Sequence, residues 1–258
     1  MKYRGTSSES RPGGRLPPGT AVREDGARVP ASDPDARPLR RPPMSETELA
    51  TRRLLVELLG VFYGKGWVSG TGGGICGPAD GGGLLLAPTG VHKERVQTDE
   101  FFTVDPADGR VLRTPGDPEL RPSECNQIFC LAARERGARS VVHSHALSAV
   151  LAGDLSAGGD QLEVRDLEML KGVRGVANRD VHLVPVIRNT PREGELVEQL
   201  TSVLGDPRFA ASFAVIVADH GAYIWGDDVW EAKRHTEVYH FLFEAAVARR
   251  DREKEGTS

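Results

Sequence analysis

The spacing of apolar residues predicts a helix near residue 50. Between residues 54 and 62, leucines and a phenylalanine recur every three or four positions, which places them on one face of a helix. Residues 45–48 read Ser-Glu-Thr-Glu, a capping box in which the serine oxygen accepts a backbone N–H and the last glutamate reaches back. Glycines at 64 and 66 interrupt the pattern. The helix is therefore expected to begin after Ser45 and to end near Gly64.

Beyond this helix, short apolar runs alternate with stretches of helical spacing. The expected strands are residues 84–87, 101–104, 140–143, 181–187, 213–217 and 222–225. The expected helices are residues 124–136, 193–204 and about 228–250. The last two strands are joined by a tight turn, Asp219-His220-Gly221, so they must be antiparallel. We therefore predict an α/β fold with a mixed sheet and helices on both faces.

Composition separates residues 1–43 from the rest of the 258-residue chain. This segment holds eight of the seventeen prolines and nine Lys/Arg against five Asp/Glu, without helical or strand periodicity. We predict that it is a disordered N-terminal extension and that residues 44–258 form one folded domain. Subtracting its charge of +4 from the total of -4 leaves -8 on the remaining residues. An acidic body gives no reason to expect nucleic-acid binding.

Patterns that the sequence lacks exclude several classes of protein. No run of 18 apolar residues is present, so neither a membrane span nor membrane attachment is expected, and we predict a cytoplasmic location. The three cysteines, at 76, 125 and 130, form no CxxC pair, which argues against a disulfide framework or a structural zinc site. A protein that acts on a small molecule is therefore the expected class.

Three histidines stand where predicted strands end. His143 and His145 are two residues apart at the end of an apolar run, so a strand presents both imidazoles on one face. His220 follows a second apolar run and precedes Gly221. A lone His-x-His pair is weak evidence, but three imidazoles at strand ends predict a site for zinc or another divalent ion. The other four histidines, at 92, 182, 235 and 240, are expected to be structural.

Two turns are candidates for binding a phosphate. The first has four glycines in five positions, residues 70–74, and exposes backbone N–H groups beside the hydroxyls of Ser69 and Thr71. The second, Pro88-Thr89-Gly90, follows the strand predicted at residues 84–87. Neither has the pattern of a Walker loop or of a Rossmann fingerprint. Taken singly, each is also compatible with an ordinary turn.

Together these features resemble the class II aldolase and adducin superfamily over about residues 46–250. The matching features are the glycine-rich turn, the Pro-Thr-Gly turn, Pro122-Ser123-Glu124, His143-Ser144-His145 and His220-Gly221. Three stretches, residues 66–75, 90–95 and 167–172, are similar to the methylthioribulose-1-phosphate dehydratase family within that superfamily. The sugar aldolases differ, because they usually carry an asparagine at the position of Gly74 and two serines before the glutamate.

The resemblance implies a three-layer α/β/α fold and a homotetramer with active sites near subunit boundaries. It implies one zinc ion per subunit, held by His143, His145 and His220. The implied reaction is the loss of water from 5-methylthio-ribulose 1-phosphate, which gives 2,3-diketo-5-methylthiopentyl 1-phosphate in methionine salvage. Glu168 matches the acid/base position of the dehydratases, and Glu124 matches the catalytic carboxylate of the aldolases. Both are therefore candidate catalytic residues.

The remaining candidate residues are those expected to bind the substrate and its phosphate. They are Ser69, Gly70, Thr71, Gly72, Gly73, Thr89, Gly90, Ser123, Cys125 and Lys171. Cys125 has two interpretations, since it either lines the methylthio end of the pocket or is a small buried side chain.

Two other functions are compatible with this sequence. A class II sugar-phosphate aldolase or epimerase, acting for example on fuculose 1-phosphate or ribulose 5-phosphate, would use the same metal and the same enediolate chemistry. A non-catalytic adducin-like interaction module would keep the fold and lose the metal ligands. Residues 167–172 argue against the first alternative, and the three intact histidines argue against the second.

Overall fold

The computed structural model describes residues 44–156 and 158–256. The predicted disorder of residues 1–43 lies outside the described residues and stays a prediction. The chain divides after Pro43, and the unit that begins at Met44 contains all of the described helices and strands. Within this unit, no described helix has the length and apolar character needed to cross a membrane.

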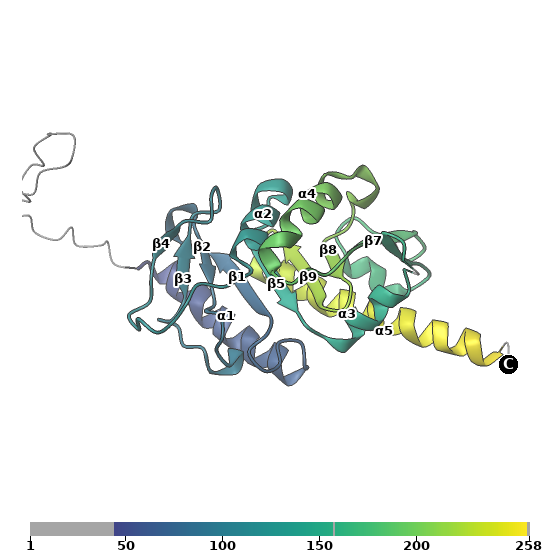
Figure 1. Cartoon of the computed structure of the whole chain (residues 1–258), viewed down its shortest axis with the longest axis horizontal. Helices are drawn as coiled ribbons and strands as arrows, with labels where there is room; N and C mark the ends of the chain where they lie inside the picture. Colours follow the sequence, from purple (N-terminus) through teal and green to yellow (C-terminus); the bar gives the residue numbers. More distant parts are fainter. Residues whose placement is uncertain (1–43, 157, 257–258) are drawn as a thin grey trace, which may run out of the picture. The chain divides into compact units, whose positions relative to one another are not determined.

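A nine-stranded sheet runs through the described residues (Figure 1). Its strands are β1 Gly74–Pro78, β2 Leu84–Leu86, β3 Phe102–Val104, β4 Val111–Arg113, β5 Ser140–Ser144, β6 Gln161–Val164, β7 His182–Ile187, β8 Ala214–Val217 and β9 Gly221–Gly226. Their order across the sheet is β4-β3-β2-β1-β5-β9-β8-β7-β6. Within this sheet β7 and β8 are parallel, and every other neighbouring pair is antiparallel. The prediction of a mixed sheet is confirmed.

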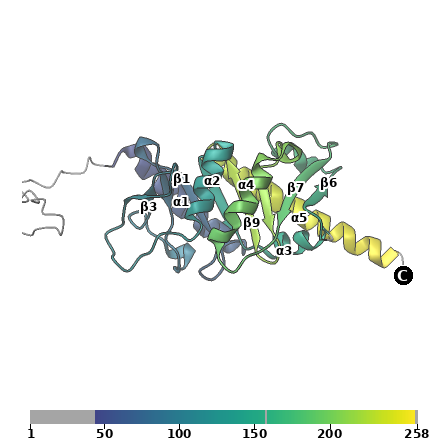
Figure 2. The same cartoon turned by 45° about the horizontal axis from the view of Figure 1, so that its top comes forward.

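Helices cover both faces of this sheet. The α-helices are α1 Glu46–Gly64, α2 Asn126–Arg136, α3 Leu147–Asp154, α4 Val197–Gly205 and α5 Val229–Gly256. On one face, α2 and α4 pack against each other and share an apolar cluster with Tyr223 and Trp225 of β9 (Figure 2). On the other face, α1, α3 and α5 pack against residues that alternate with these, such as Val142 and Ile224. The three-layer α/β/α arrangement is confirmed.

The apolar pattern of the sequence predicts six of the nine strands and four of the five α-helices in the described residues. It does not predict the elements in which apolar and polar residues show little alternation. The structure adds β1, β4, β6 and α3, which the sequence pattern does not predict. The sequence of β1 is Gly-Ile-Cys-Gly-Pro, so its composition indicated a turn rather than a strand. The helix predicted at residues 193–204 is a 3-10 helix, η4 Glu193–Leu196, followed by α4. The helix predicted from residue 124 begins instead at Asn126.

The start of α1 corrects the predicted capping box. Ser45 Oγ accepts the backbone N–H of Glu48 at 3.0 Å, as the motif predicts. The Glu48 carboxylate, however, does not return to Ser45. It is buried and accepts hydrogen bonds from Arg52 (2.9 Å), from Arg113 (2.8 Å) and from the backbone N–H of Asp80 (2.9 Å). The carboxylate therefore joins α1 to β4 and to the segment after β1 instead of closing the helix end.

This arrangement predicts that Glu48→Gln destabilises the protein. Arg52 is 2% exposed, so the substitution leaves its guanidinium buried without a counter-charge. Breaking a buried pair in this way costs roughly 3–5 kcal/mol, which urea denaturation would measure. Glu46→Gln is the matched control, because Glu46 is exposed in the same helical turn and should change stability by less than about 0.5 kcal/mol. Equal losses in the two variants would contradict the assignment.

Candidate metal centre

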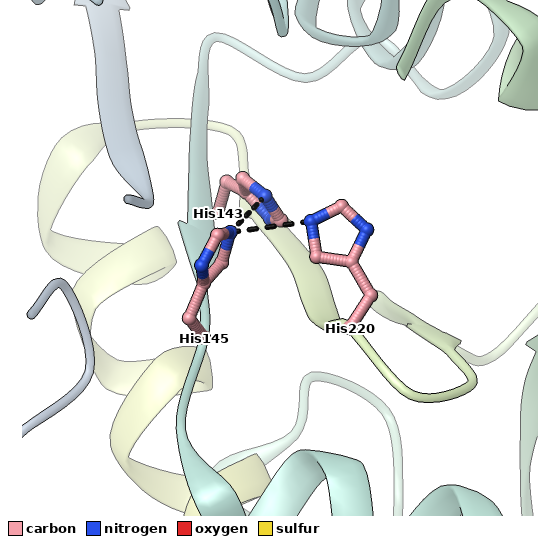
Figure 3. A group of neighbouring side chains, drawn as sticks. All are labelled: His143, His145 and His220. Carbon is pink, nitrogen blue, oxygen red and sulfur yellow. Dashed lines mark hydrogen bonds between the residues drawn. The ribbon is translucent and has the colours of Figure 1, made fainter. Parts of the chain in front are cut away.

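Three histidine side chains converge at the end of the central strands (Figure 3). His143 lies in β5, His145 follows the end of β5, and His220 lies in the turn between β8 and β9. The Nε2 atom of His145 is 2.8 Å from Nε2 of His143 and 3.2 Å from Nε2 of His220. The structure thus brings together the three histidines that the sequence singled out.

The pairing of β5 with β9 explains this convergence. The register places His143 opposite Tyr223, so the β8–β9 turn that carries His220 lies beside the end of β5. The two segments approach closely enough to require glycine, since a Cβ atom on Gly221 would lie 2.0 Å from the carbonyl oxygen of Ser144. The pairing of β5 with β9 therefore holds the two segments that carry the imidazoles close together.

Hydrogen bonds orient two of the rings. Nδ1 of His143 lies 3.2 Å from the carbonyl oxygen of Ala222, and Nδ1 of His220 lies 3.1 Å from Oδ1 of Asn189. Because these oxygens accept, Nδ1 donates in each pair and Nε2 keeps its lone pair. Burial lowers the pKa of all three histidines, most strongly that of His143. The rings are therefore neutral near pH 7, which is the form that ligates a metal.

These observations fit a divalent metal ion. Three neutral imidazoles present Nε2 atoms that lie within 4.8 Å of one another. Catalytic zinc sites typically use three protein ligands and keep a further position for water or substrate. Histidine ligands usually hold their second nitrogen in a hydrogen bond, as His143 and His220 do here. The chemistry of this donor set therefore matches zinc and the other divalent ions that imidazole binds.

A carboxylate, a phenol and a thiol stand next to His143. Oε1 of Glu193 lies 3.8 Å from Nε2 of His143, and the hydroxyl of Tyr223 donates to the other oxygen, Oε2, at 2.8 Å. The Tyr223 ring also stacks on His143, with ring centroids 4.1 Å apart and planes inclined by 4°. Burial and the Glu193 carboxylate raise the pKa of the Cys125 thiol well above its ordinary value, so Cys125 stays protonated.

The sequence pattern does not single out Glu193, Tyr223 or Asn189. Asn189 and Glu193 follow β7, which is parallel to β8, with Ile187 opposite Val217. The carboxyl ends of parallel strands lie at the same edge of a sheet, so the segment after β7 lies beside the turn that carries His220. The end of the strand predicted at residues 181–187 was therefore the sequence feature from which residues 189–193 could have been found.

One of the two candidate phosphate loops lies against a histidine, and the other is connected to it through Lys93. A Cβ atom on Gly72 would lie 2.5 Å from Nδ1 of His145, so the glycine-rich turn packs directly on that ring. Lys93 of the 3-10 helix η2 (Lys93–Arg95) joins the two loops. Its buried Nζ donates to the carbonyl oxygens of Thr71 at 2.8 Å and Val91 at 3.1 Å. Burial lowers the pKa of Lys93.

The predicted phosphate residues differ in their accessibility. Ser69, Gly70 and Thr71 are exposed, while Gly72, Gly73, Thr89 and Ser123 are partly buried. Thr89 donates its backbone N–H to the carbonyl oxygen of Arg121 at 3.0 Å, which joins the second turn to the segment that leads to Ser123. The glycine-rich turn, the Pro-Thr-Gly turn and the start of α2 are thus connected through Lys93 and Thr89.

The two candidate acids are not brought to the histidines within the described chain. Glu168 lies on the 3-10 helix η3 (Glu168–Gly172), and its side chain is 71% exposed. Lys171 and Asn178 donate to its carboxylate, each at 2.7 Å, and these hydrogen bonds lower the pKa of Glu168. Glu124 is exposed just before α2, whereas the next residue, Cys125, is buried. No described contact joins Glu124, Glu168 or Lys171 to a histidine of the centre.

The other four histidines have contacts outside the group formed by His143, His145 and His220. His182 lies 3.0 Å from the hydroxyl of Tyr239, and His235 lies 2.7 Å from the carbonyl oxygen of Trp225. His240 is buried and lies 3.3 Å from the hydroxyl of Ser148, while the side chain of His92 is 63% exposed. The three cysteines are buried and form no disulfide.

Proteins similar in sequence to this chain are repeatedly named as dehydratases of methylthioribulose 1-phosphate. The model of the "Class II Aldolase and Adducin N-terminal domain" matches residues 53–247. A methylthioribulose-1-phosphate dehydratase from Gallus gallus is 36% identical over 209 residues, which are 79% of this chain and 85% of that protein. A probable bifunctional methylthioribulose-1-phosphate dehydratase/enolase-phosphatase E1 from Oryza sativa subsp. indica is 38% identical over 208 residues. This match covers 76% of the chain and 40% of the rice protein, so the chain spans less than half of that relative.

A solved structure has the same fold. An L-fuculose 1-phosphate aldolase superposes with a TM-score of 0.64 at 16% sequence identity, covering 81% of this chain and 89% of that chain. Such low identity establishes a shared fold and nothing about the substrate. The chain therefore belongs to the class II aldolase and adducin family and, within it, to the methylthioribulose-1-phosphate dehydratases.

Proposed function

We propose that this chain is a zinc-dependent hydro-lyase of methionine salvage. It converts 5-methylthio-ribulose 1-phosphate into 2,3-diketo-5-methylthiopentyl 1-phosphate and water. The observation that carries the proposal is the convergence of three histidine Nε2 atoms beside the glycine-rich turn. The names of the relatives supply the substrate, and the resemblance supplies zinc, with one ion per subunit.

The reaction breaks a C–H bond and a C–O bond on adjacent carbons. A proton leaves C3, next to the C2 ketone, and the C4 hydroxyl departs as water, after which the enol becomes the second ketone. A divalent ion held by His143, His145 and His220 would stabilise the negative charge that develops on substrate oxygen. The chain itself must orient the sugar phosphate, accept the C3 proton and protonate the leaving hydroxyl.

Glu168 is the proposed acid/base, and Glu124 is the second candidate. Both are exposed in the single chain, and Lys171 belongs to the same surface as Glu168. A homotetramer with active sites near subunit boundaries is the arrangement in which such an exposed glutamate acts on substrate. We therefore propose that the active form is this homotetramer. A cytoplasmic location is proposed with it.

The proposed phosphate site is formed by the glycine-rich turn, the Pro-Thr-Gly turn and Lys93. Lys93 is 3% exposed, and within the described chain no carboxylate lies within salt-bridge distance of its ammonium. A buried cation is costly unless it is paired. The substrate phosphate would supply the missing negative charge, and backbone N–H groups of residues 70–73 would add donors. Cys125 is proposed to line the methylthio end, because its thiol is buried and protonated.

The first prediction concerns the metal ligands. Replacing His143, His145 or His220 by alanine should remove both bound metal and dehydratase activity, because each supplies one of three ligands. Elemental analysis of the purified variants measures the metal. His92→Ala is the control, since its side chain is 63% exposed and should leave metal and activity unchanged. Full metal occupancy in a His220→Ala protein would remove that residue from the ligand set.

The second prediction separates dehydratase from aldolase. Glu168→Gln keeps the size of the side chain but cannot carry a proton, so kcat should fall about 10²- to 10⁴-fold with KM little changed and metal retained. Glu124→Gln should lower kcat by a smaller factor than Glu168→Gln does. Each variant is assayed with 5-methylthio-ribulose 1-phosphate and with fuculose 1-phosphate, and the products are identified by mass. Wild-type dehydration by Glu168→Gln would overturn its role, and cleavage of fuculose 1-phosphate that depends on Glu124 would favour the aldolase.

The third prediction concerns Lys93. Lys93→Met should raise KM for the phosphorylated substrate roughly 10- to 100-fold, the effect of losing a charge-assisted hydrogen bond, and should weaken competitive inhibition by inorganic phosphate. Lys65→Met removes an exposed lysine and serves as control. If Lys93 only joins the two loops, Lys93→Met will lower the melting temperature and leave the inhibition constant of phosphate unchanged in the folded fraction.

A further inference from the structure

We propose that Arg249 of α5 is a positioning residue for Glu168. Its guanidinium holds a strained turn, residues 165–166, which directs the chain into η3, and Glu168 is the first residue of η3. This inference rests on the proposed function, in which Glu168 is the acid/base. It extends that function, because neither the motifs nor the relatives' names assign a role to Arg249.

The first argument is the backbone conformation of Asp166. Its φ is +55°, and apart from glycines the described chain has a positive φ only at Asp166 and Asp219. Asp219 stands beside His220 of the proposed metal site, and Asp166 stands two residues before Glu168. The left-handed region is sterically unfavourable for residues with a side chain. Asp166 is exposed, so packing of its own side chain does not hold it there, and another group must do so.

The second argument is the way in which Arg249 holds this turn. Its Nη1 donates to the carbonyl oxygen of Arg165 at 2.8 Å, and its Nη2 donates to that of Asp166 at 3.0 Å. These carbonyls belong to the two peptide groups on either side of the Asp166 Cα, so φ and ψ of Asp166 set their relative orientation. One planar guanidinium that binds both carbonyls therefore favours the left-handed conformation over a relaxed one.

The third argument is that α5 also holds the rest of η3. A 3-10 helix of five residues forms few backbone hydrogen bonds, so its position depends on its attachments. Leu170, in the middle of η3, shares an apolar cluster with buried residues of α5. Arg234 of α5 donates its Nε–H to the carbonyl oxygen of Gly172, the last residue of η3, at 3.2 Å. Arg249 supplies the corresponding attachment before the first residue of η3.

The fourth argument is the exposure of Glu168. Its side chain is 71% exposed, and its carboxylate is held by Lys171 and Asn178 of the same surface segment. These hydrogen bonds orient the carboxylate on η3, but they do not fix η3 relative to the sheet. Arg249 contributes that connection, because α5 packs on η3 and also on β5 and β9. The turn therefore governs the position from which Glu168 acts, and a displacement of about 1 Å is costly in catalysis.

The first test follows the backbone and does not depend on turnover. Wild-type protein, Arg249→Met and Arg250→Met are compared by hydrogen–deuterium exchange with mass spectrometry. Arg249→Met removes both donors and keeps an apolar stem, so amides of residues 166–172 should exchange at least about tenfold faster. Amides of β5 and β9 should keep their wild-type rates. Arg250 is exposed at the next position of α5, so Arg250→Met is the matched control and should match the wild type.

The second test measures turnover of 5-methylthio-ribulose 1-phosphate. Arg249→Met should lower kcat roughly 10- to 100-fold, with KM changed less than about twofold and metal content unchanged. Glycine adopts a positive φ without steric cost, so Asp166→Gly alone should keep the wild-type kcat. For the same reason, adding Asp166→Gly to Arg249→Met should raise kcat again at least about fivefold. A merely structural role of Arg249 would lower the melting temperature and would not be corrected by glycine at this position.

The outcomes distinguish this proposal from the proposed function. Unchanged exchange at residues 166–172 in Arg249→Met would overturn the proposal, and so would faster exchange combined with a wild-type kcat. Failure of Asp166→Gly to restore kcat would overturn it as well. A wild-type protein that does not dehydrate the substrate would contradict the proposed function, and the exchange rates would still decide whether Arg249 holds the turn.

Discussion

The antiparallel pairing of β5 with β9 is the constraint on which the site depends. This pairing places His143 on Tyr223 and brings the turn that carries His220 against the end of β5. It tolerates only glycine at position 221, where a Cβ atom would collide with the carbonyl oxygen of Ser144. Because backbone hydrogen bonds hold the strands, the imidazoles are placed before any ion arrives, and little conformational entropy remains to be lost on binding.

Burial then determines the electrostatics of the centre. It lowers the pKa of the three histidines, so they offer lone pairs rather than positive charge. The charges nearby come from Lys93, which is tied to the loops, and Glu193, which is tied to Tyr223. The neutral ligands and the charged groups thus come from different elements, and Tyr223 joins the two sets because it stacks on His143 and donates to Glu193.

The sequence predicted the parts of the site that local patterns encode. The apolar runs that end at His143 and before His220 located the strands, and the two-residue spacing of His143 and His145 matched a strand end. Glu193 carries no such pattern, since it opens a segment that reads as an ordinary helix. Its position follows from the parallel pairing of β7 with β8, a contact between distant segments. The ion pair of Glu48 with Arg113 could not be predicted from a local pattern either, because the two residues lie far apart in the sequence.

The placement of the acidic residues follows a physical division within the site. His143 lies in a central strand and the other two imidazoles lie directly at strand ends, whereas Glu168 and Glu193 both begin short 3-10 helices. Such helices are held by few backbone hydrogen bonds, so their first side chains can move at a small cost in free energy. The resemblance locates Glu168 where periodicity cannot, because η3 has five residues of which Leu170 alone is buried, and a single buried residue sets no period.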